Sequence, residues 1–529
     1  MNAYENVAVA TDQALCSKIG THVLRELNGT AADAAVAVAL SLGVVNFQSS
    51  GLGGGGFLVY YDSATKESTA INFREKAPKG INETLLVEEL AQRRGLIVGV
   101  PGELKGLERL WQKHGRVEWQ KLFDTAADVA ESGFPVTNWT ERALGSKDET
   151  TFTDQLKSFL KPDSKRYIVE GDHFSAQQLG RTLRQIGAHG NADPFYKGQL
   201  AHDMVKEINA AGGVFTYEDF ATYDVEETPT MKSNFMGMTV CSAPPPSSGA
   251  VTQYVLNILS KLGEDLNVFD DDARHLIAEA LKFGFAARMR LGDTKEAREF
   301  AEELLNPDKA EKAKLKIDFS TTHLPEYYDG HYVLPDEEGT THFCIVDGEG
   351  NAVSLTSTVG LYFGSRILSE SLGFLYNSHL TNFSKSDKYD PSYNLVPNPT
   401  NYLRPGKRPQ SSTSPLILLD QNDTVVATIG ASGAHMIISS VVSTLLKYFV
   451  FGYALDEAIN EPRFHHQLVP DVVCVQEDFP DEWTEGFEAR GHVVECAPRR
   501  LAAVQAIVKE KGKFVAVCDY RKKGEPDGY

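Results

Sequence analysis

The chain has 529 residues, of which 42% are hydrophobic and 23% charged, a composition typical of a folded globular protein rather than a disordered or fibrous one. Its 52 Lys and Arg residues against 72 Asp and Glu residues give a net charge of −20, which disfavours nucleic acid or an anionic membrane as a partner. Six widely spaced cysteines without a CxxC pair predict neither a zinc site nor a disulfide scaffold, and no pattern calls for a metal or an organic cofactor.

The N-terminal segment lacks the pattern of a signal peptide, because polar residues 2–12 lead directly into the predicted domain. No apolar run reaches the roughly 20 residues that cross a bilayer. Residues 436–455 come nearest, but serines and Lys447 interrupt them, which favours a buried helix. We expect a cytoplasmic protein if Met1 is the natural start, and a secreted or membrane-anchored one if the N-terminus was trimmed.

In chain order, residues 31–47 predict a nearly all-apolar helix, followed by a loop at 48–56 and a strand at 57–61. The loop contains the pattern GxGxxG at residues 51–56. A dinucleotide site needs strand, glycine turn and helix in that order, whereas this loop runs from helix to strand. We therefore expect a tight turn that allows close backbone approach. Residues 270–293 predict an amphipathic helix that begins with three aspartates.

A seam is expected between residues 301 and 339, where a charged helical stretch (301–316) gives way to an exposed, poorly regular segment (323–339). The runs 341–346 and 351–357 then predict a β-hairpin. If Val346 pairs with Asn351, Thr340 faces Ser357 and lies beside Thr358. A shift of one residue would change which hydroxyl shares the face of Thr340, so the register stays open.

Thr340 opens this strand directly after the acidic sequence Asp336-Glu337-Glu338-Gly339. If the 339–340 bond were cut, Thr340 would carry both a hydroxyl and a free α-amine. An α-amine has a pKa of about 7.7–8.0, so it could accept the proton of the hydroxyl at neutral pH. The result would be an N-terminal threonine nucleophile. By spacing alone, an ordinary strand residue is the commoner interpretation.

Residues 430–434 (Gly-Ala-Ser-Gly-Ala) follow a predicted strand at 424–429 and open a predicted helix at 435–446. The nucleophile-elbow pattern GxSxG fails because position 434 is alanine, which disfavours Ser432 as a nucleophile. The N–H groups of Gly433 and Ala434 could instead hold a developing oxyanion, although a plain strand–helix turn fits the pattern equally well. The adjacent His465 and His466 point to different sides of any regular element, so we expect surface or packing histidines rather than metal ligands.

Taken together, these features resemble the γ-glutamyltransferase (γ-glutamyl transpeptidase) family of N-terminal nucleophile hydrolases over almost the whole chain. The matching residues are 16–20, 53–57, 74–75, 77–78, 100–103, 209–214, 242–244, 355–365 (LTSTVGLYFGS), 405–407, 411–412, 430–433, 461–463 and 524–529.

The resemblance implies an α+β fold, a four-layer αββα sandwich formed jointly by two subunits of one self-cleaved precursor. It places the cut between Gly339 and Thr340, giving a large subunit of residues 1–339 and a small subunit of residues 340–529. It further implies an amidase or transferase that cleaves γ-glutamyl amides such as glutathione or its conjugates through a threonine acyl-enzyme. Water or an amine, such as an amino acid, would act as acceptor.

The resemblance also assigns site residues. Thr340 matches the nucleophile and Thr358 the threonine that supports it. Gly433 and Ala434 match the oxyanion pair. Arg74, Ser411 and Ser412 match groups that hold the donor α-carboxylate, a task suited to a guanidinium fork and hydroxyls.

Three positions depart from the family pattern, and all are expected to line the donor pocket. Gly360 replaces an asparagine or another polar residue, His379 replaces the acidic or amide contact of the donor α-amine, and Asn382 replaces an aspartate. We expect that an unmodified γ-glutamyl donor, whose ammonium loses its anionic partner, binds poorly or in a changed pose, and that a glutaryl or N-acyl-glutamyl donor fits better. If His379 or a neighbour repairs the contact, ordinary γ-glutamyl chemistry survives. From another class, a non-catalytic relative that binds a carboxylate is the alternative.

Overall fold

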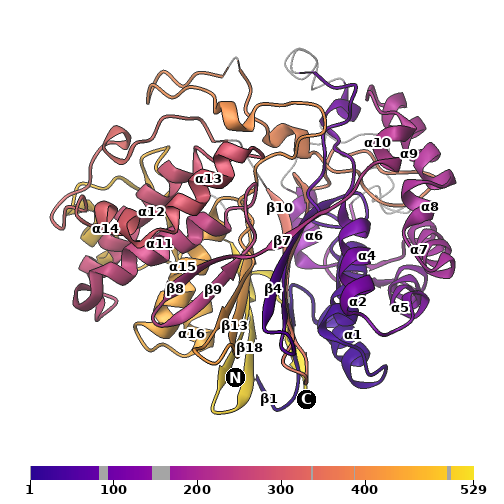
Figure 1. Cartoon of the computed structure of the whole chain (residues 1–529), viewed down its shortest axis with the longest axis horizontal. Coiled ribbons are helices and arrows are strands. Elements are labelled where there is room, and N and C mark those ends of the chain that lie inside the picture. The colour runs from indigo at the N-terminus through magenta and orange to yellow at the C-terminus, as the bar shows by residue number, and fades with distance from the viewer. Residues whose placement is uncertain (1, 83–92, 146–166, 335–337, 387, 497–501) are drawn as a thin grey trace.

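The computed structural model describes residues 2–82, 93–145, 167–334, 338–386, 388–496 and 502–529. Two seven-stranded sheets stack face to face, and helices cover the outer face of each (Figure 1). The first sheet has the order β1 (Asn2–Tyr4), β18 (Lys513–Cys518), β17 (Ala503–Glu510), β13 (Val425–Ser432), β12 (Leu416–Leu419), β9 (Met238–Ser242), β8 (Met231–Phe235). The second has the order β19 (Asp527–Gly528), β2 (Ala8–Thr11), β10 (Gly339–Val346), β11 (Ala352–Gly360), β3 (Gly55–Asp62), β4 (Glu67–Asn72), β7 (Glu226–Pro229).

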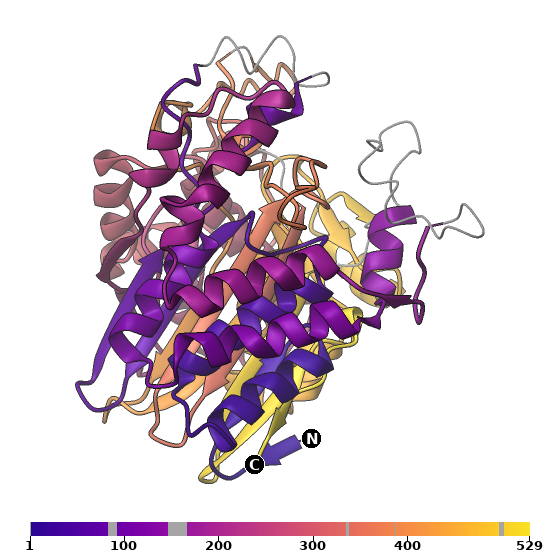
Figure 2. The ribbon, with the colours of Figure 1, turned by 90° about the vertical axis from the view of Figure 1, so that its right-hand side faces the viewer.

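The helices divide between the two outer faces. The outer face of the second sheet carries α1 (Ala14–Arg25), α2 (Ala31–Val45) and α4 (Glu103–His114), which contact its strands. Other helices of the first 210 residues lie on this side of the molecule (Figure 2): α5 (Trp119–Ser132), α6 (Asn138–Gly145), α7 (Gln177–His189), α8 (Asp193–Tyr196) and α9 (Gln199–Ala210). The first sheet is covered by α11 (Gly249–Leu262), α12 (Asp271–Arg288), α13 (Lys295–Leu304), α14 (Pro307–Lys314), α15 (Met436–Phe449) and α16 (Leu455–Asn460) (Figure 1). These layers are the predicted αββα sandwich.

Smaller elements complete the described chain. They are α10 (Tyr217–Ala221), α17 (Asp481–Glu488), a three-stranded sheet of β14 (Phe464–His465), β15 (Val473–Val475) and β16 (Val494–Cys496), and a two-stranded sheet of β5 (Phe134–Pro135) and β6 (His173–Phe174). Among the described residues, no helix is both long enough and apolar enough to span a membrane.

Helix α2 confirms the predicted apolar helix and shows why its sequence lacks a polar face. All of its side chains are buried, between the second sheet and the helices α1, α4 and α5. A capping box starts the helix: Thr30 accepts from the backbone of Asp33, whose carboxylate accepts from the Thr30 N–H at 2.9 Å.

Two expectations need correction. The predicted helix at 270–293 is α12, which begins after the N-cap Asp270 but ends at Arg288. The segment 323–339 is poorly regular as expected, yet it is not uniformly exposed, and residues 335–337 lie outside the described residues. Tyr328 is buried, because its hydroxyl reaches into the fold and donates to Glu279 of α12 at 2.5 Å.

Strand β11 of the second sheet and strand β13 of the first contact each other across the interface between the sheets. The Ser354 hydroxyl in β11 donates to the Ile429 carbonyl in β13 at 3.1 Å, and the Thr428 hydroxyl donates to the Val353 carbonyl at 3.3 Å. Because successive residues of β11 meet successive residues of β13, the two strands point the same way. The C-terminal ends of β11 and β13 therefore lie at the same end of the sandwich.

Candidate active site

The hairpin of β10 and β11 sets two threonines opposite one another. Thr340 pairs directly with Thr358, and Val346 pairs with Ala352 rather than with Asn351. The register is shifted by one residue because the Asp347 carboxylate organises the turn, accepting from the N–H groups of Glu349 (3.0 Å) and Asn351 (2.9 Å). The open question of register is thus answered in favour of Thr358.

The Thr358 hydroxyl is hydrogen-bonded to the peptide bond that is predicted to be cut. It donates to the Gly339 carbonyl oxygen at 2.5 Å and accepts from the Gly360 N–H at 2.9 Å. The Gly339 carbonyl belongs to the 339–340 peptide bond. Thr358 therefore polarises the carbonyl that a Thr340 hydroxyl would attack.

The main-chain carbonyl of Thr340 has a separate partner. Lys522 donates to the Thr340 carbonyl at 2.7 Å and to the Asp12 carboxylate at 2.6 Å. Asp12 also accepts from the neighbouring Thr341 hydroxyl at 2.6 Å and from Gln505 at 2.7 Å. Sequence reasoning missed Lys522 and Asp12, because they lie near opposite ends of the chain and match no motif.

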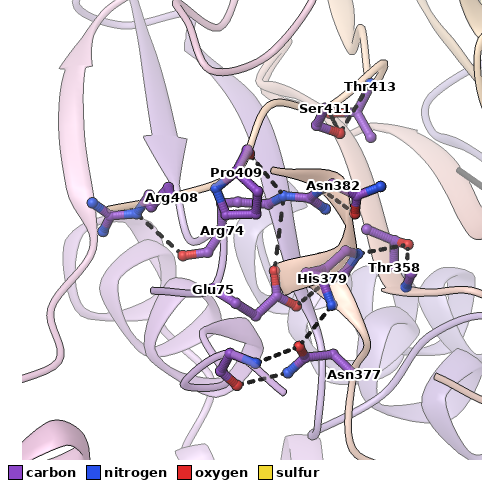
Figure 3. A network of polar contacts seen from close by, with 12 residues as sticks. Arg74, Glu75, Thr358, Asn377, His379, Asn382, Arg408, Pro409, Ser411 and Thr413 are labelled. Atoms are coloured by element: carbon purple, nitrogen blue, oxygen red, sulfur yellow. Dashed lines mark hydrogen bonds and ion pairs between the residues drawn. The ribbon is translucent and has the colours of Figure 1, made fainter. Parts of the chain in front are cut away.

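Arg74 and Asn382, both assigned to the donor pocket, contact each other. The Arg74 guanidinium is buried and donates to the Asn382 side-chain oxygen at 3.2 Å (Figure 3). It also donates to the main-chain carbonyls of Pro409 at 3.3 Å and Gln410 at 3.2 Å. These bonds fix the guanidinium beside the loop that carries Ser411 and Ser412.

The two serines have different partners. The Ser411 hydroxyl donates to Thr413 at 3.2 Å (Figure 3). The Ser412 hydroxyl accepts from the guanidinium of the buried Arg288 at 2.7 Å and lies 2.9 Å from Nδ1 of His435. Arg288, which the sequence analysis did not single out, is a second cation beside the predicted carboxylate site.

His379 contacts both the threonine pair and a buried carboxylate. Its Nε2 lies 3.4 Å from the Thr358 hydroxyl oxygen, and its Nδ1 lies 2.8 Å from Oε1 of Glu75 (Figure 3). Both His379 and Glu75 are fully buried. The sequence matched Glu75 only as part of a family segment, without a role. A carboxylate therefore lies beside the predicted donor pocket, and it is in contact with His379.

The strand–turn–helix prediction at residues 424–446 is confirmed by β13 and α15. Gly433 and Ala434 form the turn with φ of 134° and 56°, so Ala434 adopts a left-handed conformation unusual for a residue with a Cβ. Thr358 and Gly433 each stand four residues beyond the contact of Ser354 with Ile429. The turn therefore lies at the same end of the sandwich as Thr358.

The remaining candidates from the sequence, Ser432, His465 and His466, occupy buried packing positions. The Ser432 hydroxyl is buried and has no hydrogen-bond partner within the described ranges, so no base accompanies it. His465 and His466 are buried packing residues, as expected; Nδ1 of His465 lies 2.8 Å from the Ser439 hydroxyl.

Burial shifts the pKa of two groups near the threonine pair. It raises the pKa of Glu103 from 4.5 to about 8, although a hydrogen bond from Ser357 opposes the shift; the charge of Glu75 adds to it. Burial lowers the pKa of His342 from 6.5 to about 3. At neutral pH, Glu103 is therefore mostly protonated and His342 uncharged.

One group of residues in the described part of the chain has the side-chain types of a metal site: His275, Glu279 and His492. The side chains of these three residues already contact one another or neighbouring residues. Nδ1 of His275 lies 2.8 Å from Nε2 of His492, and Glu279 accepts from Thr322 at 2.7 Å and from Tyr328. We assign this group to the packing of α12.

Comparisons with known proteins extend these observations. The family model described as Gamma-glutamyltranspeptidase matches residues 16–529. Scoloptoxin SSD14 of Scolopendra dehaani is 37% identical, over 100% of this chain and 93% of its own length. Glutathione hydrolase proenzyme 1 of Schizosaccharomyces pombe is 33% identical, over 99% of this chain and 85% of its own length.

The fold also has a counterpart among solved structures. The cephalosporin acylase of Bacillus halodurans matches with a TM-score of 0.86 and 24% identity, over 100% of this chain and 96% of the acylase. This likeness confirms the fold. The family match over nearly the whole length is more specific, and with it the chain belongs to the gamma-glutamyltranspeptidase family of enzymes.

Proposed function

We propose that this protein is a self-cleaving amidase or transferase that acts on γ-glutamyl amides through Thr340. The observation that carries the proposal is the bond from the Thr358 hydroxyl to the Gly339 carbonyl, at 2.5 Å, directly opposite Thr340. One relative at 33% identity bears the name glutathione hydrolase proenzyme, which supports a precursor that is cut.

Self-cleavage begins with attack of the Thr340 hydroxyl on the Gly339 carbonyl carbon. The new C–O bond forms as the 339–340 C–N bond breaks, and the hydroxyl proton ends on the nitrogen of Thr340. Water then hydrolyses the ester. The products are a Gly339 carboxylate and a Thr340 that carries a free hydroxyl and a free α-amine.

In the mature protein, the α-amine accepts the hydroxyl proton while Thr340 attacks the donor amide. Arg74, Ser411 and Ser412 hold the donor carboxylate, and Arg288 donates a hydrogen bond to Ser412. The N–H groups of Gly433 and Ala434 stabilise the oxyanion. The α-ammonium of Thr340 then passes this proton to the donor nitrogen as the donor C–N bond breaks. The amine product leaves, and an acyl ester remains on Thr340, which water or an acceptor amine resolves.

Thr340→Ala tests the nucleophile. The wild type should give two fragments on denaturing electrophoresis, and N-terminal sequencing of the smaller should begin Thr-Thr-His-Phe. Thr340→Ala should remain one chain without amidase activity, because no hydroxyl attacks Gly339. Thr340→Ser is the matched control: it keeps the hydroxyl and should still be cut. Cleavage of Thr340→Ala at the same bond would contradict the proposal.

A second candidate is an acylase for donors that lack a free α-ammonium. Asn382 is neutral and accepts from Arg74, and the Glu75 carboxylate lies 2.8 Å from His379. A donor ammonium would therefore meet no free carboxylate at these positions, and burying it uncompensated is costly.

Paired substrates test this candidate. We expect kcat/KM for a glutaryl anilide to exceed that for the γ-glutamyl anilide, which differs only by the amine. Asn382→Asp restores an anion and should shift the ratio toward the γ-glutamyl compound by about tenfold. A strong wild-type preference for the γ-glutamyl compound would remove the acylase candidate and leave the γ-glutamyl function.

A further inference from the structure

Four groups form a continuous line of contacts that ends at the bond predicted to be cut. Glu75 Oε1 lies 2.8 Å from Nδ1 of His379, and Nε2 of His379 lies 3.4 Å from the Thr358 hydroxyl oxygen. That hydroxyl donates to the Gly339 carbonyl at 2.5 Å. Glu75, His379 and Thr358 are all buried, and Figure 3 shows the imidazole between the carboxylate and the threonine.

Asn377 fixes the main chain that carries His379. The backbone N–H of His379 donates to the Asn377 side-chain oxygen at 3.2 Å, and the Asn377 amide group donates to the carbonyls of Gly53 and Gly99, both at 2.8 Å. The main chain at His379 is therefore tied to the glycine loop at residues 51–56 and to the segment before α4.

Gly360 provides the space for the imidazole. Its φ is 94°, and a Cβ there would lie 3.2 and 3.3 Å from Cδ2 and Nε2 of His379 and 2.5 Å from the Ser378 hydroxyl. A larger residue at 360 would crowd the ring. Gly360 and His379, two of the three departures from the family pattern, are thus linked: the glycine admits the histidine.

The hydrogen bonds of Thr358 decide which ring nitrogen of His379 donates. The Thr358 hydroxyl gives its own proton to the Gly339 carbonyl, so Nε2 of His379 contacts the Thr358 oxygen as a donor. On the other side of the ring, Glu75 lies 2.8 Å from Nδ1 of His379 and 3.9 Å from Nε of Arg74. A hydroxyl that accepts from Nε2–H and from the Gly360 N–H becomes a stronger donor to Gly339.

The geometry points to a relay in which Glu75 holds His379, and His379 strengthens the Thr358 hydrogen bond that activates the Gly339 carbonyl for self-cleavage. This inference rests on the proposed function, since the relay acts on the bond that Thr340 attacks. As the Thr340 oxygen bonds to the Gly339 carbon, negative charge develops on the carbonyl oxygen, and Thr358 stabilises it. His379 acts through Thr358 and is a positioning residue.

Removing either member of the relay should slow cleavage without unfolding the protein. His379→Gln and Glu75→Gln should each lower the first-order rate constant of self-cleavage by about tenfold or more. The double variant should be no slower than the slower single one, because the two residues act as one unit. His465→Gln is the matched control: it changes another buried histidine, which packs against Ser439, and should leave the rate unchanged. Thermal unfolding of each variant reports whether it is folded.

The pH profile of cleavage separates a relay from a packing role. Before cleavage, the Thr340 nitrogen is an amide and does not titrate. In the described part of the chain, the Glu75 carboxylate contacts His379, and the charged or titratable groups Arg74 and Glu103 lie next to Glu75. The pH profile of cleavage should differ between wild type and His379→Gln, because only the wild type carries an imidazole beside Thr358. The dependence that remains in His379→Gln is the part due to Glu103, whose pKa burial raises to about 8, and Glu103→Gln measures that part.

The outcomes distinguish this inference from the proposed function. If wild type is cut at Thr340 and His379→Gln is cut at the same rate with the same pH profile, the relay is overturned and the function stands. If each substitution slows cleavage but the effects multiply, Glu75 and His379 do not form a unit. A wild type that is never cut overturns both.

Discussion

Glu103 illustrates how burial can outweigh favourable local contacts at a single residue. It opens α4, where the helix dipole favours a carboxylate, and Ser357 donates to it at 2.8 Å. Burial nevertheless raises the pKa of its carboxyl from 4.5 to about 8, with the nearby Glu75 adding to the rise. A largely neutral carboxylic acid therefore lies next to the Glu75–His379 pair at neutral pH.

The raised pKa of Glu103 predicts that the stability of the protein depends on pH. Between pH 4.5 and 8 the folded state keeps a proton on Glu103 that the unfolded state has lost. The contribution of Glu103 to the free energy of unfolding is therefore fully present below pH 4.5 and is lost as the pH rises to about 8. The loss can reach about 1.4 kcal/mol per pH unit. In Glu103→Gln, urea unfolding from pH 5 to 8 should show a smaller decrease than in wild type, both in a Thr340→Ala background.

The exposed Glu118 supplies the control for this measurement, since Glu118→Gln should retain the wild-type decrease. Equal pH profiles for wild type and Glu103→Gln would show that Glu103 titrates in the folded state as it does in the unfolded chain.

At the scale of elements, the turn between β13 and α15 combines the predicted oxyanion site with backbone strain. Ala434 has φ of 56°, a left-handed conformation that costs a residue with a Cβ about 1–2 kcal/mol. Glycine adopts it freely, but its greater freedom in the unfolded chain offsets roughly 0.5–1 kcal/mol of the gain. The N–H group assigned to the oxyanion is present with either residue.

Ala434→Gly should therefore leave the free energy of unfolding unchanged or raise it by up to about 1.5 kcal/mol, with amidase activity retained. Ala434→Val places a β-branched side chain in the same conformation and should destabilise the protein by more than about 1 kcal/mol. Urea unfolding and anilide turnover measure both effects. A marked loss of stability in Ala434→Gly would show that the methyl group contributes packing that outweighs the strain.

At the scale of the whole molecule, the two predicted subunits share both sheets. Residues before 340 supply β1, β8 and β9 to the first sheet and β2, β3, β4 and β7 to the second. Residues from 340 onward supply the remaining strands of both sheets. The C-terminal carbonyl of Tyr529 even accepts from the Asn6 N–H at 2.7 Å, at the opposite end of the sequence.

This arrangement predicts that cleavage leaves one particle. Strand pairing and buried apolar surface hold the fragments far more strongly than surface charges do, so they should co-elute in size-exclusion chromatography even in 1 M salt, where exposed ion pairs are screened. Only denaturant should separate them. Fragments that separate in native buffer would mean that the cut chain does not keep the sandwich.

The sequence by itself determined the features that depend on neighbouring residues. The apolar run of α2, the hairpin of β10 and β11 and the strand–turn–helix of β13 and α15 follow from local hydrophobic patterns and turn residues. Family motifs pointed to Thr340, Thr358, Arg74 and the serine pair in the same way.

Only the tertiary structure decided which side chains meet. The partner of His379 is Glu75, that of the Thr340 carbonyl is Lys522, and that of Ser412 is Arg288. The register that sets Thr340 against Thr358 depended on how the Asp347 carboxylate closes its turn. The physical reason is that hydrogen bonds and ion pairs need contact within a few ångströms. Sequence patterns fix the order of the elements, whereas the stacking of the two sheets sets those distances.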